Sequence, residues 1–189
     1  MDALIIKPHA LTITMDSIVL PTQSIFIQNK LRQTFYEISA SFFFFASMAS
    51  QTIQCYRNGA QIYNGDALCK KTSIQLLEEI GLPNGLFPLD DIEEFGYNSE
   101  AGFVWLIQKK KKDHTFKKIK RAVSYAPEVT AFVEKGKMKK MTGVKTKELM
   151  LWLSVVEMYI EDPSSKKITF KTGTGLSDSF PVSAFQLEE

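Results

Sequence analysis

The chain has 189 residues, enough for one domain with a hydrophobic core and too few for two large domains. Its content of 44% hydrophobic and 23% charged residues is that of an ordinary globular protein. No apolar run approaches the roughly 20 residues that a membrane-spanning helix needs. The net charge is only +2, but residues 109–147 hold 14 Lys and Arg against three acidic residues. Such segregation favours attraction to phosphates, to an anionic membrane or to an acidic partner.

The first 47 residues show no sustained periodicity, helix cap or turn signal. They also lack the apolar core of a secretory signal and the Arg-rich, acid-poor composition of a transit peptide. Residues 48–50 resemble a translation start. We therefore expect 1–47 to be a disordered or artefactual extension, 48–189 to be a single domain, and the protein to be cytoplasmic.

The clearest helix signal covers residues 72–81. Thr72 and Gln75 match a capping box, Leu77 and Ile80 belong to an apolar stripe at helical spacing, and Gly81 stands where a left-handed C-terminal residue is expected. A second short helix is expected within 51–69. Cys55 and Cys69 form no C-x-x-C pair and cannot build a structural zinc site alone, so two reduced thiols are favoured over a disulfide.

From residue 90 onward the pattern changes to short strands separated by turn signals. Segments 92–97 and 102–108 fit a hairpin, 134–137 and 162–165 fit turns, and alternation returns near residues 180–184. Pro127 interrupts an alternating segment at 123–134, which favours an edge strand or two short strands there. These elements predict a mainly β (α+β) domain, a small antiparallel β-barrel-like fold with one or two N-terminal helices.

The stretch 149–160 is apolar on both faces if it forms one strand. Leu149, Leu151, Leu153 and Val155 would face one way, and the other side would carry the candidate apolar surface, which consists of Met150, Trp152, Val156 and Met158, with Ile160. One side must fill the core. The other is either covered by the helix at 72–81 or open to an apolar ligand, and the first alternative is the ordinary one.

Catalytic signals are weak. His114 is the one histidine of 48–189, is surrounded by lysines, and is expected at an exposed hairpin tip. An acidic cluster at Asp90, Asp91, Glu93 and Glu94 has no calcium-loop spacing and is interpreted as a solvated strand. The Gly-rich turn at 173–175 lacks the Lys-Ser/Thr of a phosphate loop. We predict no catalytic residue, no metal ligand and no cofactor.

The strongest local feature is a run of basic residues, which supplies the candidate anion or ligand surface: Lys109, Lys110, Lys111, Lys112, Lys117, Lys118, Lys120 and Arg121. Aromatic interleaving is limited to Phe116, and arginine, the preferred bidentate phosphate ligand, is nearly absent. The run is therefore interpreted first as a solvated lysine face, second as a surface for anionic lipid, and last as a nucleic-acid site.

Several separated stretches carry a resemblance to a known family: 76–88, 95–98, 102–106, 129–133, 143–145, 176–177 and 180–185. Taken together they resemble the plant family named domain of unknown function 538 (DUF538), over about residues 56–185. The resemblance implies a compact β-barrel-like domain with helix on its N-terminal side. It implies no established activity; lipid binding and hydrolase activity have both been suggested for its members. Since the matching part begins after residue 48, it also favours placing 1–47 outside the domain.

These observations lead to one functional prediction and two alternatives. The prediction is a soluble, non-enzymatic binding module for an amphipathic or anionic, lipid-like ligand, with the apolar surface taking the hydrophobic part and the basic run the charged part. The first alternative is an esterase-like hydrolase that uses His114 or the acidic cluster. The second is a protein-interaction domain whose acidic partner meets the basic face.

Overall fold

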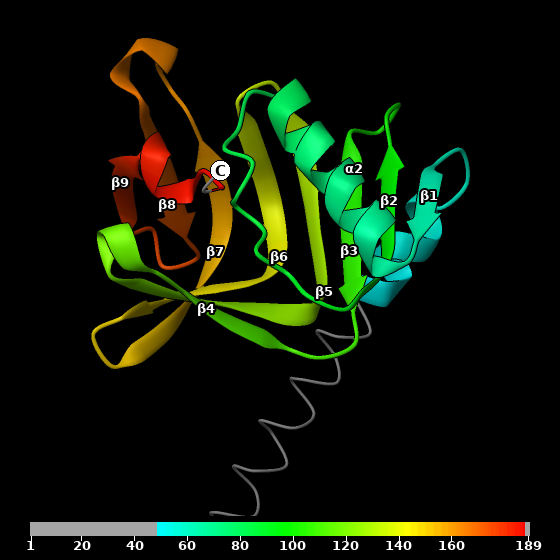
Figure 1. Ribbon diagram of the computed structural model, residues 1–189, viewed down its shortest axis with the longest axis horizontal. Helices are drawn as coiled ribbons and strands as arrows, with labels where there is room; N and C mark the ends of the chain where they lie inside the picture. Colours follow the sequence, from blue (N-terminus) through cyan, green and yellow to red (C-terminus); the bar gives the residue numbers. More distant parts are fainter. Residues whose placement is uncertain (1–48, 188–189) are drawn as a thin grey trace, which may run out of the picture. The chain divides into compact units, whose positions relative to one another are not determined.

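The computed structural model describes residues 49–187, which lie within one compact unit of the chain, Phe44–Glu189. The extension predicted at 1–47 lies outside the described residues. Nine strands form a single antiparallel sheet (Figure 1). The predicted mainly β, α+β class is confirmed. The sheet curls without closing, because β1 and β9 stand at its two ends, so the fold resembles a barrel only loosely.

The elements follow a helix at residues 49–56 and are, in chain order, β1 Gln61–Asn64, α2 Asp66–Glu79, β2 Ile92–Asn98, β3 Phe103–Gln108, β4 Lys112–Phe116, η1 Lys117–Ile119, β5 Arg121–Glu134, β6 Lys137–Glu148, β7 Leu151–Tyr159, η2 Pro163–Ser165, β8 Lys167–Thr172, β9 Ser177–Pro181 and η3 Val182–Phe185. The sheet order is β1-β2-β3-β5-β6-β7-β8-β9, and β4 pairs with β5 off this path. The expected β2–β3 hairpin and the expected turns after β5 and β7 are confirmed.

Strand β3 is buried on both faces, because helices cover the sheet on both sides. Phe103 and Trp105 pack in one cluster with Ile53 of the first helix. Val104 and Leu106 point the other way, into the larger core that α2 covers. This double coverage explains why β3 is almost continuously apolar rather than alternating.

Helix α2 begins six residues before the predicted start. Its N-cap position is Gly65, and the first helical residue is Asp66. Thr72 lies inside the helix, where its hydroxyl donates to the carbonyl of Leu68 at 2.9 Å. The interpretation of Thr72 as the N-cap of a capping box is therefore wrong. Its hydroxyl instead donates to a carbonyl of the preceding turn, which is the other local hydrogen bond that threonine makes in helices.

The end of α2 is as predicted. Gly81 has φ +78, and its N–H donates to the carbonyl of Glu78 while the N–H of Leu82 donates to that of Leu77. These two bonds form a Schellman motif, which satisfies carbonyls that the helix leaves unpaired. The second expected helix also exists, at 49–56, but the same region contains β1, which pairs with β2 and was not predicted.

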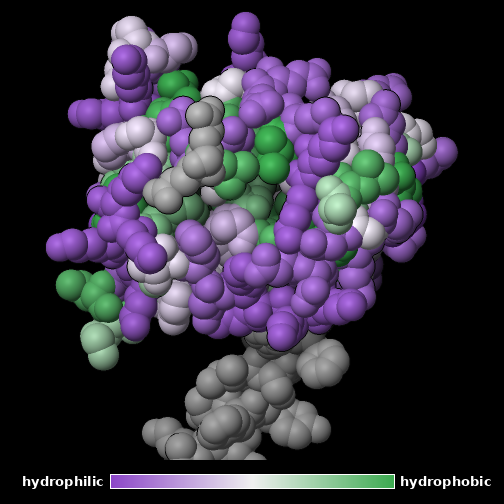
Figure 2. Space-filling view, viewed as in Figure 1, coloured by the Kyte–Doolittle hydropathy of each residue, from purple (hydrophilic) through white to green (hydrophobic). Residues whose placement is uncertain are grey.

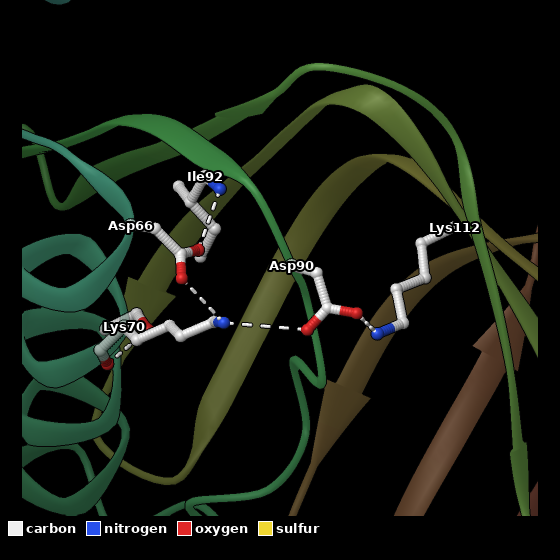
Figure 3. A network of polar contacts seen from close by, with 6 residues as sticks. Asp66, Lys70, Asp90, Ile92 and Lys112 are labelled. Carbon is white, nitrogen blue, oxygen red and sulfur yellow. Dashed lines mark hydrogen bonds and ion pairs between the residues drawn. The ribbon is translucent and has the colours of Figure 1, made fainter.

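A polar network ties the start of α2 to β2 and β4 (Figure 3). The Asp66 carboxylate accepts from the N–H of Ile92 at 2.9 Å and from Lys70 Nζ at 2.8 Å. Lys70 also lies 3.5 Å from Asp90, whose other oxygen contacts Lys112. The hydrogen bond from Lys70, followed by that from Ile92, lowers the pKa of Asp66 below its usual value.

Because its folded-state pKa is lowered, Asp66 stabilises the fold above the unfolded pKa and loses this contribution as the pH falls through the folded value. We expect Asp66→Asn to lower the free energy of unfolding at pH 7 by about 1 kcal/mol, a modest figure because the side chain is partly exposed. The difference from the native chain should shrink below pH 3.8, the ordinary pKa. Urea denaturation at several pH values measures this difference.

Glu79→Gln, at an exposed position of the same helix, is the control and should leave the dependence of stability on pH unchanged. An Asp66→Asn effect independent of pH would contradict the role assigned to Asp66.

Strand β5 is one long central strand, so the expectation of an edge strand or two short strands is wrong. Its first part, up to Tyr125, pairs with β4, and its second part, from Glu128, pairs with β3. Pro127 lies where the partner changes, a position that needs no ladder N–H. There Gln108 donates to the carbonyls of Tyr125 and Ala126, at 3.3 and 2.9 Å.

Side chains close the gap between the β4–β5 hairpin and the C-terminal segment. Arg121 lies 2.8 Å from Asp178 of β9, Lys118 donates to the carbonyl of Ser183 in η3, and the rings of Phe116 and Phe185 are 4.8 Å apart. These side-chain contacts join the β4–β5 hairpin to the C-terminal segment without backbone pairing, and they enclose a cavity on the inner side of the curled sheet.

Candidate functional site

The inner side of the curled sheet contains a cavity of about 280 Å³, just below the roughly 300–1,000 Å³ typical of ligand pockets. It lies between strands β5 to β9, η1 and η3. Figure 2 shows hydrophobic side chains in a hollow of the face seen there, bordered by polar ones. The lining residues are Leu86, Phe116, Ile119, Arg121, Val123, Tyr125, Val144, Thr146, Glu148, Met158, Phe170, Thr172, Leu176, Ser177, Asp178, Phe180 and Phe185.

Strand alternation explains why these residues face the cavity. On β5, residues 121, 123 and 125 line it, and on β6, residues 144, 146 and 148 line it. Successive side chains of a strand point to opposite faces, so positions two apart share one face. The two strands are paired here, Val123 with Thr146 and Tyr125 with Val144, so together they form one wall.

The part of the cavity around Tyr125 is apolar, and the hydroxyl of this tyrosine has a hydrogen-bond partner. Tyr125 is buried, and its hydroxyl donates to the carbonyl of Leu86 at 2.8 Å; burial raises the pKa of this phenol. Phe170 and Phe185 form an aromatic wall, with ring centroids 5.1 Å apart. This part of the cavity can therefore offer dispersion and desolvation to a ligand rather than hydrogen bonds.

Charged groups gather at one side of the cavity. Arg121 contacts Glu148, lies 2.8 Å from Asp178, and has its guanidinium 5.4 Å from the centre of the Phe180 ring. The hydrogen bond with Glu148 raises the pKa of Arg121. One cation and two carboxylates give this group, which we call the polar mouth, a net negative charge. The polar mouth can offer both hydrogen-bond donors and acceptors to a ligand. The positive charge of Arg121 is already balanced by the two carboxylates, so it attracts an anionic ligand only weakly.

The predicted basic run does not stay together in the fold. Lys112 is half-buried against Asp90, Lys111 pairs with Asp113, and Arg121 belongs to the polar mouth. Lys118 reaches the carbonyl of Ser183. The remaining members are exposed, in the segment before β4 or at the β4–β5 turn: Lys109, Lys110, Lys117 and Lys120.

The predicted apolar candidates also separate. Met158 is buried and lines the cavity, and Val156 is half-buried. Met150 and Trp152 lie at the exposed end of the β6–β7 hairpin. Strict alternation across 149–160 is wrong because a register shift between Val155 and Glu157 breaks it, and β7 begins only at Leu151. Helix α2 contacts β1 and β2 most, and its buried residues share the larger core with Val155 and Met158, whereas Met150 and Trp152 are exposed and are not covered by it.

The polar residues that were considered for catalysis contact neighbouring side chains of the fold. His114 lies in the middle of β4 rather than at a hairpin tip, with its ring 4.6 Å from that of Phe116. Burial, followed by the neighbouring lysines, lowers the pKa of His114.

In the acidic cluster, Asp90 belongs to the network with Lys70 and Lys112. Glu94 accepts from Arg57 at 2.6 Å and from Trp105 Nε1 at 2.7 Å, so the interpretation as a wholly solvated strand is wrong. Within residues 49–187 no group of three potential metal ligands occurs.

Most of the cavity was missed by sequence reasoning. Arg121 and Met158 were singled out, but for other surroundings. The alternation at 123 and 125 was visible, yet nothing in the sequence indicated that β8, β9 and η3 would return to face β5. Cys55 and Cys69 are free, as the favoured interpretation had it. None of the helices described between residues 49 and 187 has the length and hydrophobicity of a membrane span.

Fold and cavity together define a mainly antiparallel β domain with a small, mostly apolar cavity and a charged mouth. Residues 73–186 match the family described as "Protein of unknown function, DUF538". This match covers more than half of the chain, and the protein belongs to that family. No curated protein and no solved structure matches it.

Proposed function

We propose that this domain binds a small amphipathic, lipid-like molecule in the cavity of the curled sheet. The observation that carries the proposal is the cavity itself: about 280 Å³, lined mostly by apolar and aromatic side chains, with its charged groups gathered at one side. Concave apolar sites with a few convergent polar groups are the common form of small-molecule sites.

The hydrophobic part of the ligand would contact the side chains of Val144, Met158 and Phe170. Its polar head would meet Arg121, Glu148 and Asp178 at the mouth. Because this group already carries two carboxylates for one guanidinium, a neutral head that both donates and accepts suits it better than an anion. The proposal thus keeps the apolar part of the sequence-based prediction and moves the polar part from the lysine run to the mouth.

Val123→Phe tests this proposal directly. Val123 is half-buried on the cavity wall, and a phenyl group there would occupy space that the ligand needs. We expect decanol, measured by displacement of a fluorescent apolar probe from the full chain, to bind at least tenfold more weakly. The melting temperature should stay the same or rise, since the added ring fills a cavity instead of overpacking a full core.

Ala122→Phe is the matched control. Ala122 is the neighbouring β5 residue, also half-buried, and is absent from the cavity lining. It should bind decanol as the native chain does. Unchanged binding by Val123→Phe, or equal losses in both folded variants, would overturn the proposal.

A further inference from the structure

The end of the β6–β7 hairpin exposes four consecutive apolar residues. Leu149 is 95% exposed, Met150 86%, Leu151 67% and Trp152 39%. We call these four residues the hairpin tip. The other large exposed apolar residues of the described part occur singly in the sequence, at Leu68, Leu176 and Leu187. Figure 2 shows the tip as a hydrophobic projection at the lower left, where Figure 1 places the end of the β6–β7 hairpin. A contiguous exposed apolar group of this kind marks an interaction site.

Folding alone does not account for these residues. Glu148 pairs with Leu151, so the hairpin turns through the two residues Leu149 and Met150. Leu149 has φ +53, a conformation for which two-residue turns normally use Gly, Asn or Asp. The sequence places a large apolar side chain there instead, at a cost in backbone strain and in solubility. Local choices that oppose the fold are expected at functional positions.

Lysines surround the tip. Lys147 is the cross-strand partner of Trp152, and its Nζ lies 5.9 Å from the centre of the Trp152 ring; that of Lys111 lies 5.6 Å from it. Lys145, two residues along β6, is exposed. The β4–β5 turn adds exposed Lys117 and Lys120 near the same end, since Arg121 contacts Glu148 beside the tip.

We infer that the hairpin tip inserts into the surface of an anionic membrane. Leu149 and Met150 would enter the boundary between head groups and acyl chains, Trp152 would lie at the interface, and the lysines would contact lipid phosphates. A protein partner fits less well, because a stable interface buries about 800 Å² per partner and the tip is only four residues. A second copy would bring like-charged lysines together.

Membrane docking would also place the cavity against its source of ligand. Thr146 and Glu148 line the cavity and immediately precede the tip. A tip held in the lipid surface would therefore bring the polar mouth next to it, a consequence that rests on the function proposed above. The class of ligand is then an amphipathic lipid taken from, or delivered to, the membrane.

Tryptophan fluorescence of the full chain with vesicles provides the test. Trp105 is fully buried and Trp152 is partly exposed, so a blue shift on adding vesicles reports on Trp152. We expect a shift with vesicles of phosphatidylcholine and phosphatidylserine that weakens as salt is added. The double change Leu149→Asp and Met150→Asp should reduce vesicle partitioning at least tenfold, and Lys147→Glu should weaken binding to anionic vesicles more than to neutral ones.

Leu68→Asp, which removes a lone exposed leucine from α2, is the matched control and should bind vesicles as the native chain does. Val123→Phe should still bind vesicles while losing decanol, so that failure of the cavity and failure of the tip are distinguishable. Absence of a Trp152 shift on anionic vesicles, or full vesicle binding by the Leu149→Asp/Met150→Asp variant, would overturn the inference. Capture of a defined protein by the tip without vesicle binding would do so as well.

Discussion

Gly96→Ala should lower the free energy of unfolding by about 3 kcal/mol or more, which is large against the 5–15 kcal/mol of a typical domain. Gly96 on β2 lies directly opposite Trp105 on β3. A Cβ added at Gly96 would overlap three atoms of the indole ring. The ring cannot yield: it is fully buried, its Nε1 donates to Glu94 at 2.7 Å, and Arg57 lies over its face at 5.8 Å from the ring centre.

Guanidinium denaturation of the purified variant measures this loss. Gly173→Ala is the matched control, since a Cβ there would meet its nearest atom, in Val156, at an ordinary 3.6 Å; its stability should change by less than about 1 kcal/mol. In a Trp105→Phe background, Gly96→Ala should cost less, because the overlapped part of the ring is gone. An equal cost in both backgrounds would show that the overlap is not the cause.

The second large effect is a reversal of head-group preference at the polar mouth. The native chain should bind decanol at least about tenfold more tightly than decanoate, because Arg121 is already engaged by Glu148 and Asp178. The double change Glu148→Gln and Asp178→Asn frees the guanidinium and removes two repelling charges. Decanoate should then bind about tenfold more tightly than decanol, about 1.4 kcal/mol in favour of the anion, which is within the range of one charge-assisted hydrogen bond.

Competitive displacement of the same fluorescent probe by each compound gives this ratio. Glu157→Gln provides the control, since Glu157 on β7 pairs with Lys137 on β6 and does not line the cavity. Its preference should match that of the native chain. If the mouth variant kept the native preference for decanol, Arg121 would not be the group that meets the ligand head.

The fold could be predicted from the sequence wherever the signals were local. The Schellman glycine at 81, the β2–β3 hairpin and the turn around Gly136 depend on neighbouring residues, and all three are present. The start of α2 was misplaced because Thr72 and Gln75 imitate a capping box, whereas the actual helix starts after Gly65. Pro127 led to the wrong expectation of an edge strand or two short strands. Its missing N–H costs no ladder hydrogen bond, because Pro127 lies where the partner of β5 changes from β4 to β3.

The site depends on contacts between residues far apart in the chain, so most of it could not be predicted from the sequence. Arg121 stands in the basic run of the sequence, but Asp178, 57 residues away, gives it different surroundings. The apolar stretch at 149–160 was noticed, yet only the register shift after Val155 and the turn at Leu149 decide which members face the cavity and which face solvent. Periodicity indicates which residues share a face, but not what lies opposite that face.

Native mass spectrometry of the full chain, purified from a eukaryotic host without detergent, shows whether the cavity holds a ligand. We expect a reproducible small amphipathic adduct that is lost on denaturation, is retained by Ala122→Phe and is absent from Val123→Phe. A bare mass that stays bare after incubation with decanol would contradict the proposed function, as would an adduct that Val123→Phe keeps.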